Sequence, residues 1–193
     1  EVIGKAVPVI IIDVGTGIGY VGDTVTISAH VEGDPNADVV IKVAGVALDG
    51  TGAFNVPYNG TFVVEAFTDE NSTHVAGYNN TTFVGVKRAS EIESVVVPTD
   101  GVVVGNNVTV NVTMVDITVG TVLVEINGTN YTVAVGSDKT ANLSVALPVG
   151  SYVAHVYYVE NELYNGSAWS SPVEFEVIGK AVPVIIIDVG TGI

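Results

Sequence analysis

The chain contains no cysteine, so neither disulfide bonds nor the redox state of its compartment decides its stability. Basic residues are scarce: six Lys and Arg stand against 21 Asp and Glu, which gives a formal net charge of −15 at pH 7. A surface of this charge repels duplex DNA and anionic lipids, which argues against nucleic-acid binding. No apolar run reaches the roughly 18 residues that suggest a transmembrane helix, so we expect no membrane span in this segment.

Sequence motifs of catalysis are also missing. No Gly-X-Ser-X-Gly, phosphate-binding loop or His-Glu-X-X-His occurs. The histidines His30, His74 and His155 are far apart and lack metal-type spacing, and His30 and His155 fall on outward strand faces. Residues 15–19 (GTGIG) have the glycine spacing of a nucleotide loop, but a strand is expected next where a helix would be needed. We therefore interpret them as a turn and expect no enzyme.

The most informative feature is a duplication. Residues 1–18 (EVIGKAVPVIIIDVGTGI) recur letter for letter as residues 176–193, a period of 175 residues. The simplest interpretation is a window cut from a longer tandem array, in which function comes from reach and surface. We expect one domain over 1–88, a second over 89–179, and the start of the next repeat over 180–193, a copy of 5–18.

A weaker repeat lies inside the longer one. VGDTVT at 21–26 matches VGNNVT at 104–109, and GTFVVEAF at 60–67 matches GSYVAHVY at 150–157. Each half of the long repeat is therefore interpreted as one of two diverged sister domains.

Strand signals fill both halves, with apolar and polar residues alternating between turns rich in Gly, Asn, Asp and Pro. The first half predicts strands near 7–13, 24–32, 38–45, 52–57, 60–69 and 81–88. The second predicts strands near 94–99, 107–115, 120–127, 129–136, 140–147, 150–160 and 171–178. Asn127-Gly128 is the strongest hairpin signal, because it suits a type I′ turn. The pattern predicts an all-β chain: two tandem immunoglobulin-like β-sandwich domains plus the first strand of the next repeat.

One predicted strand is apolar on both faces and so needs cover on both sides. It either crosses from one sheet to the other inside its own domain, or is clamped at a junction between neighbouring domains or chains. The candidate repeat-junction residues are Val9, Ile10, Ile11, Ile12 and their copies Val184, Ile185, Ile186 and Ile187. We expect the first four to be buried in the first unit, and the copies to be buried likewise in the next unit.

Asn-X-Ser/Thr sequons are unusually frequent. They occur at Asn59, Asn71, Asn79, Asn80, Asn107, Asn111, Asn127, Asn130, Asn142 and Asn165, which are ten of the 14 asparagines. Random placement would give roughly two, because 28 of the 193 residues are Ser or Thr. Thr-rich outer strand faces explain part of the excess, and N-glycosylation of several sites would explain the rest. Asn107 and Asn111 share the polar face of one strand, whereas Asn79 and Asn80 overlap so that only one is expected to carry a glycan.

Acidic residues offer a weaker signal. Several fall at predicted strand ends or in turns: Asp13, Asp23, Asp34, Asp38, Asp49, Asp69 and Glu70. Loops at the end of a sandwich can gather such oxygens around Ca²⁺. Asp is also an ordinary turn residue, and no spacing singles out ligands. We expect no metal site and no cofactor, with a loop-bound Ca²⁺ as the alternative.

Three segments carry a family resemblance. VGNNVTVNVT at 104–113, GTVLVEINGTNYT at 120–132 and LPVGSY at 147–152 resemble the Ig-like repeats of archaeal adhesin-like surface proteins, especially those of methanogens. The resemblance covers most of 94–178. Residues 7–88 keep only the frame, with Ala44-Gly45 in place of the Asn-Gly hairpin. It implies a secreted, glycosylated array and carries no catalytic residues.

These observations predict a non-enzymatic extracellular structural protein, a glycosylated tandem-repeat stalk or filament at the cell surface. Its expected partners are neighbouring repeats or copies of itself, and N-linked glycans. Three alternatives remain open: the spacer region of an adhesin, accessory domains of a carbohydrate-active surface enzyme, and a pilus-like polymer of separate chains joined by donor strands.

Overall fold

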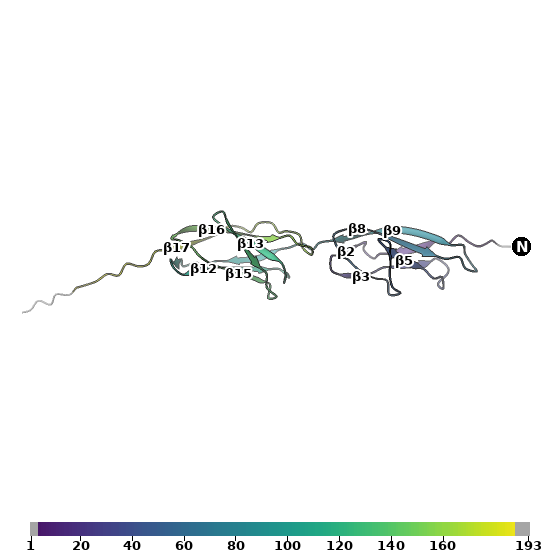
Figure 1. Cartoon of the computed structure of the whole chain (residues 1–193), viewed down its shortest axis with the longest axis horizontal. Helices are drawn as coiled ribbons and strands as arrows, with labels where there is room; N and C mark the ends of the chain where they lie inside the picture. The colour runs from purple at the N-terminus through teal and green to yellow at the C-terminus, as the bar shows by residue number, and fades with distance from the viewer. Residues whose placement is uncertain (1–3, 188–193) are drawn as a thin grey trace, which may run out of the picture. The chain divides into compact units, whose positions relative to one another are not determined.

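The computed structural model describes residues 4–187, which form two compact units (Figure 1). Unit 1 contains the described residues up to Ala89 together with Asn161–Asn165, and unit 2 contains Ser90–Glu160 and the described residues from Gly166 onward. Residues 4–187 contain no helix, and their regular secondary structure consists of β-strands. The predicted all-β class is therefore confirmed. No helix long and apolar enough to cross a membrane occurs in this described part.

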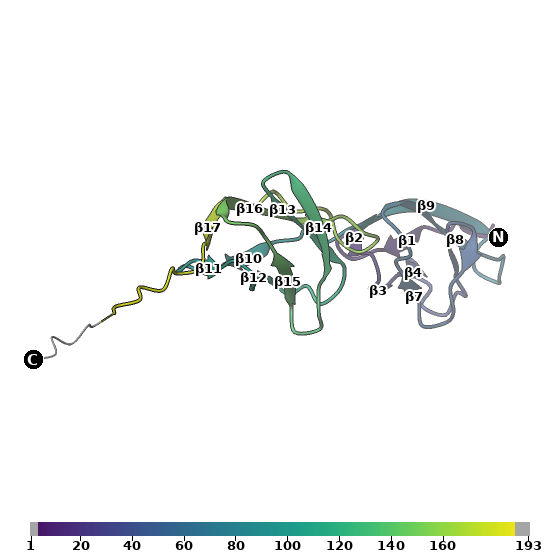
Figure 2. The same ribbon diagram turned by 60° about the vertical axis from the view of Figure 1, so that its left-hand side comes forward.

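Unit 1 has two layers, with β8 and β9 in one and β3, β4 and β7 in the other (Figure 2). The five-stranded sheet has the order β2 (Ile18–Tyr20), β9 (Gly77–Val86), β8 (Gly60–Thr68), β5 (Val40–Val43) and β6 (Val46–Ala47). The facing layer consists of β1 (Ile10–Asp13) paired with β4 (Ser28–Val31), and β3 (Thr24–Thr26) paired with β7 (Ala53–Asn55). Neighbours are antiparallel except β2, which runs parallel to β9.

Unit 2 repeats this plan, with β13, β16 and β17 in one layer and β12 and β15 in the other (Figures 1 and 2). Its five-stranded sheet has the order β11 (Val102–Val103), β17 (Val173–Ile178), β16 (Gly150–Val159), β13 (Thr121–Ile126) and β14 (Thr129–Ala134). The three-stranded sheet consists of β10 (Ile92–Val96), β12 (Asn107–Met114) and β15 (Thr140–Ala146). Each unit is thus an immunoglobulin-like β-sandwich.

The first segment of each sandwich changes sheet. In unit 1, β1 pairs with β4, and the chain then turns and pairs through β2 with β9 of the opposite layer. Gly15 and Gly17 in that turn have φ angles of 60° and 75°, which favour glycine. Residues 15–17 are therefore a turn, as predicted, and Ile18 and Gly19 already belong to β2. The first segment crosses between the sheets inside its own domain, at this turn and not within the apolar run.

The two halves also match in strand register, at β8 of unit 1 and β16 of unit 2. β8 begins at Gly60 and pairs Phe62 with Phe83, while β16 begins at Gly150 and pairs Tyr152 with Phe175. The phenol of Tyr152 donates to the Pro148 carbonyl at 2.9 Å. This agrees with the predicted equivalence of Gly60 and Gly150, and the internal repeat is confirmed.

Alternation places the cores where the sequence predicts them. On β12 the buried residues are Val108, Val110, Val112 and Met114, whereas Asn107, Thr109, Asn111 and Thr113 lie on the other face. In unit 1 the main core cluster consists of Val21, Ile27, Val43, Val56, Phe62, Val64 and Phe83. A second cluster of Ile10, Val31 and Ala66 lies under β1.

Several short strands were not predicted. These are β2, β6 and β11, each two or three residues long. β9 also starts at Gly77, four residues before the predicted strand at 81–88. Such short edge segments show no alternation of their own, because long-range pairing rather than local pattern makes them strands.

Candidate functional site

The acidic loop residues of the described part do not gather into a metal centre. Among residues 4–187, no group of three or more His, Asp or Glu side chains could hold a metal ion. The loop aspartates instead cap their own turns: Asp13 accepts from Gly15 N at 2.7 Å and Asp49 from Thr51 N at 3.0 Å. The Thr51 hydroxyl and backbone amide hold the pKa of the Asp49 carboxyl below its ordinary value. Asp13 and Asp49 thus have the ordinary role of aspartate in turns.

The candidate site is the junction segment, residues 5–13, which is built into unit 1 by polar and apolar contacts. Its start is held by the loop 71–75 that connects β8 to β9. Ala6 N donates to Thr73 O at 3.1 Å, and Val75 N donates to Ala6 O at 3.0 Å, so that Ala6 and His74 form a parallel bridge. Lys5 forms an ion pair with Glu70 beside this loop, which lowers the pKa of the Glu70 carboxyl.

Further along, the junction segment packs against β9 and β4. A Cβ at Gly77 would overlap the ring of Pro8, so glycine is what lets Pro8 lie against β9. Glu32 N donates to Val9 O at 2.9 Å, and Asn79 Nδ2 donates to Ile10 O at 2.7 Å. Residues 5–13 thus contact both layers of the sandwich.

The apolar run is only half buried. Ile10 is 4% exposed and packs with Val31 and Ala66, and Ile12 is partly buried. Val9 and Ile11 are 57% and 41% exposed. The prediction that all four side chains are buried in the first unit is therefore wrong for Val9 and Ile11. Val9 precedes β1, and the side chain of Ile11 points away from the core because side chains alternate along a strand.

The copy of this run forms no strand in the described chain. Val184, Ile185, Ile186 and Ile187 are 85%, 82%, 86% and 78% exposed. The structure contains one repeat and no following unit 1. Burial of these four residues against a following repeat, and the junction role itself, stay predictions.

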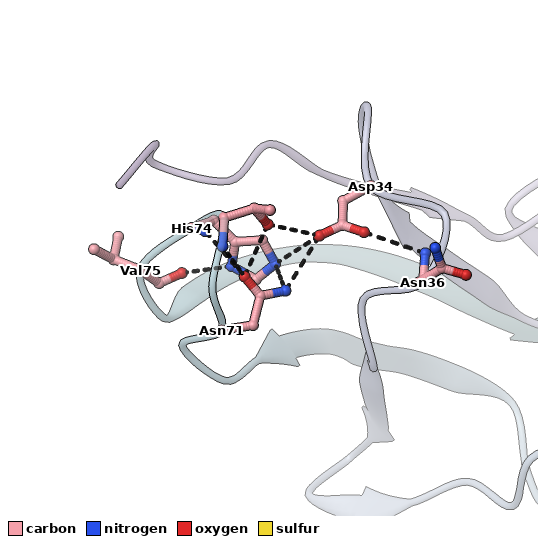
Figure 3. A network of polar contacts seen from close by, with 6 residues as sticks. Asp34, Asn36, Asn71, His74 and Val75 are labelled. Atoms are coloured by element: carbon pink, nitrogen blue, oxygen red, sulfur yellow. Dashed lines mark hydrogen bonds and ion pairs between the residues drawn. The ribbon is translucent and has the colours of Figure 1, made fainter. Parts of the chain in front are cut away.

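A polar network centred on Asp34 supports the loop that holds Ala6 (Figure 3). Asp34 Oδ2 accepts from Thr73 Oγ1 at 2.9 Å and from Asn71 Nδ2 at 3.2 Å, and it lies 3.6 Å from His74 Nε2. Its other oxygen accepts from Asn36 N at 3.2 Å. The Thr73 hydroxyl, followed by the Asn71 amide, holds the pKa of the Asp34 carboxyl below its ordinary value.

Sequence reasoning did not identify His74 as part of this network. The side chain is buried, with Nδ1 2.8 Å from Val75 O and Nε2 2.9 Å from Asn71 Nδ2. Because a carbonyl oxygen needs a donor, Nδ1 carries the proton and Nε2 accepts from Asn71. By contrast His30 is exposed and His155 half-buried on strand faces. The sequence did contain a signal for this role. Asn71 and His74 are three residues apart, as are Asn161 and Tyr164 in the equivalent loop of the second half.

The ten sequons have different surroundings. Nine have exposed asparagines: Asn59, Asn79, Asn80, Asn107, Asn111, Asn127, Asn130, Asn142 and Asn165. Asn71 is the half-buried one. Asn107 and Asn111 lie on the outer face of β12 as predicted, and Asn142 of β15 is directly opposite Asn111. Whether any of them carries a glycan stays a prediction.

No protein-family profile and no curated protein sequence matches the chain. Many solved structures resemble it, and three of them serve as examples. Fibronectin(III)-like modules of Clostridium thermocellum CbhA are 13% identical, with 89% of this chain and 95% of that chain covered and a TM-score of 0.38. A 1.5-MDa bacterial ice-binding adhesin is 20% identical, with 91% and 66% covered and a TM-score of 0.38. The immunoglobulin domains 1–5 of Sidekick-1 are 12% identical, with 84% and 37% covered and a TM-score of 0.41.

These likenesses are too low to carry any statement about activity or partners. The fold is established by the strand order and register of the two units: two all-β sandwiches of immunoglobulin-like topology in one chain.

Proposed function

We propose that this chain is a non-enzymatic, extracellular structural protein that works without a cofactor. Pairs of Ig-like domains repeat along it and form a glycosylated stalk or filament at a cell surface. The observation that carries the proposal is the junction segment. Residues 5–13 are built into unit 1, with Ile10–Asp13 as strand β1. Residues 180–187 repeat the first eight of them identically while making no strand pairing in the described chain.

Burial energetics favour a following repeat. Val184 and Ile185–Ile187 expose apolar surface to water. In a following unit 1, Ile185 and Ile187 would take the positions of Ile10, which is buried, and Ile12, which is partly buried. A side chain of this kind contributes on the order of 1.5–3 kcal/mol when fully buried. A following unit 1 would offer Ile185 the pocket that Val31 and Ala66 form around Ile10. It would also offer Lys180 the carboxylate that Glu70 offers Lys5.

The surface and the composition support an external location. Nine exposed sequons, the net charge of −15 and the absence of cysteine suit a glycosylated protein outside the cell. The resemblance to archaeal adhesin-like repeats points the same way. An adhesin spacer or accessory domains of a surface enzyme would use the same repeats, and a catalytic or binding module elsewhere in the protein would distinguish them.

The test is a two-repeat chain: residues 1–175 joined to residues 1–193. Amide hydrogen exchange is measured at the 180–187 segment in this chain and in the single-repeat chain. We expect that segment to become protected in the longer chain to the same extent as residues 5–12. Equal, fast exchange in both chains would rule out the continuous array.

A polymer of separate chains joined by donor strands is the second candidate. Residues 180–187 have the same sequence as residues 5–12, which in unit 1 fill the β1 slot, the position beside β4. The two candidates differ in connectivity. In the array each junction segment enters the domain that follows it in the same chain, whereas in the polymer it enters a second molecule. Denaturing gel electrophoresis of native material separates them, since only the array keeps the mass of several repeats.

A further inference from the structure

The loops after β8 and β16 are built alike. Asn71 Oδ1 accepts from the backbone amides of Thr73 and His74 at 2.8 and 3.0 Å. In the sister loop, Asn161 Oδ1 accepts from the backbone amides of Leu163 and Tyr164 at 2.9 and 2.8 Å. The side-chain carbonyl of each asparagine thus shapes its own loop, which is a common use of Asn in turns.

Each loop also holds an extended segment from far away in the sequence. Loop 71–75 forms the parallel bridge to Ala6, and loop 161–165, which belongs to unit 1, forms a parallel bridge between Tyr164 and Arg88. Arg88 N donates to Leu163 O and Asn165 N donates to Arg88 O, both at 2.9 Å. The pattern is the same as at Ala6, so the asparagine shapes a clasp for an incoming segment in both places.

Only one of the two clasps is a sequon. Asn71 is followed by Ser72 and Thr73, whereas Asn161 is followed by Glu162 and Leu163. The clasp geometry is therefore made equally well by an asparagine that cannot be glycosylated. The sequon at Asn71 needs no glycan to explain it.

Both hydrogens of the Asn71 side-chain amide take part in hydrogen bonds. Its nitrogen donates to Asp34 Oδ2 at 3.2 Å and to His74 Nε2 at 2.9 Å, so both hydrogens are used. A sugar on this nitrogen would replace one of them. His74 is buried, and a buried polar atom that loses its partner is costly.

The overlapping sequons on β9 differ in the same way. Asn79 Nδ2 donates to Ile10 O of the junction segment. Asn80 is directly opposite Glu65 on the outer face of the sheet, and its amide donates to the Tyr78 hydroxyl at 3.0 Å. A glycan on Asn80 extends away from the junction segment, whereas one on Asn79 starts against it.

We propose that Asn71 and Asn79 seat the junction segment and stay unmodified, and that Asn80 is the glycan acceptor of the overlapping pair. The assignment of Asn80 rests on the proposed glycosylation of the native protein. The seating role of Asn71 does not, and the two parts are tested separately.

The seating role is tested on the full 193-residue chain made in a host without N-glycosylation. Amide exchange at Ala6 and Val75 is compared between the unmodified chain, Asn71→Ala and the control Asn59→Gln, which removes an exposed sequon. We expect exchange at both amides to accelerate about tenfold in Asn71→Ala and to be unchanged in the control, with both variants still folded by circular dichroism. Asn161→Ala should do the same at Arg88. Unchanged protection of Ala6 in Asn71→Ala would overturn the clasp.

The modification pattern is tested by glycopeptide mapping of native protein. We expect glycan on Asn80 and none on Asn71 or Asn79. A glycan on Asn71 or Asn79 would overturn their assignment while supporting a glycosylated protein. Bare asparagine at all ten sequons would overturn both the Asn80 assignment and the glycosylation in the proposed function, and the exchange experiment would still decide the clasp.

Discussion

Ala44 and Asn127 occupy the same turn position in the two sandwiches, with positive φ angles of 48° and 45°. Each is followed by a glycine with a φ of 82°, Gly45 or Gly128, and the flanking strands pair directly across the two residues. Both hairpins are therefore type I′ turns. The left-handed region of positive φ costs alanine more than asparagine. Unit 1 therefore keeps this turn although the conformational preference of Ala44 disfavours it.

The first prediction follows from that strain. Ala44→Asn should raise the free energy of unfolding of unit 1 by about 0.5–1 kcal/mol, because the left-handed conformation costs Asn less than Ala. Urea titration followed by circular dichroism measures it. Asn127→Ala is the reverse substitution in unit 2. It should lower stability by more, since Asn127 Oδ1 also accepts from Val153 N at 2.9 Å. If Ala44→Asn instead lowers the free energy of unfolding, the positive φ of residue 44 does not limit the stability of the turn.

The second prediction concerns the slot of β1, which should not distinguish the two copies of its strand. Ile10→Asp puts a carboxylate between Val31 and Ala66, while Ile185, the copy of Ile10, keeps the native side chain. We expect the Ile10→Asp chain to form oligomers that grow with concentration in analytical ultracentrifugation, as residues 180–187 of a second molecule take the slot.

Two further variants serve as controls for this exchange. Ile185→Asp alone should remain monomeric and as stable as the unmodified chain, because Ile185 is exposed. The double variant with both substitutions should not form ordered oligomers, since neither copy then fits. If Ile10→Asp is folded and monomeric at every concentration, the copy does not enter the slot.

The third prediction concerns acid. The carboxyl of Asp34 has a pKa below its ordinary value in the folded chain, first because of the Thr73 hydroxyl and then because of the Asn71 amide. A depressed folded-state pKa stabilises the fold in full above the unfolded-state pKa, about 4 for Asp, and this contribution is lost as the pH falls through the folded value. The urea midpoint should therefore decline below about pH 4. Asp34→Asn should flatten that decline, and an unchanged slope would assign the acid sensitivity to other carboxyls.

The fourth prediction tests the packing of the junction segment on β9. In Gly77→Ala the new methyl would meet the Pro8 ring, and it would lie 3.2 Å from Thr68 Cγ2. We expect unit 1 to lose about 1–3 kcal/mol of stability, with faster amide exchange at Ala6. Gly50→Ala is the matched control, because nothing lies within 4 Å of its Cβ position. Equal effects of the two substitutions would mean that Pro8 does not depend on Gly77.

Local patterns of the sequence were sufficient to predict the β-sandwiches. The alternation in β12 assigns its buried face, and Asn127-Gly128 predicts the hairpin between β13 and β14, because both signals depend on neighbours along the chain. The equivalence of Gly60 and Gly150 likewise follows from comparing two short stretches of sequence, 60–67 and 150–157. The duplication of 1–18 identifies the junction segment without any coordinates.

Tertiary structure decided what the same local signals mean in context. Asn71 and Asn80 have the same sequon chemistry. The amide of Asn71 is fully used because Asp34, 37 residues away, and the buried His74 lie against it. Ala44 adopts a turn that its own preference disfavours because β5 is held by β8. A side chain's face follows from strand alternation, but the partners of a polar group depend on which distant segments pack beside it, and this is a property of the whole fold.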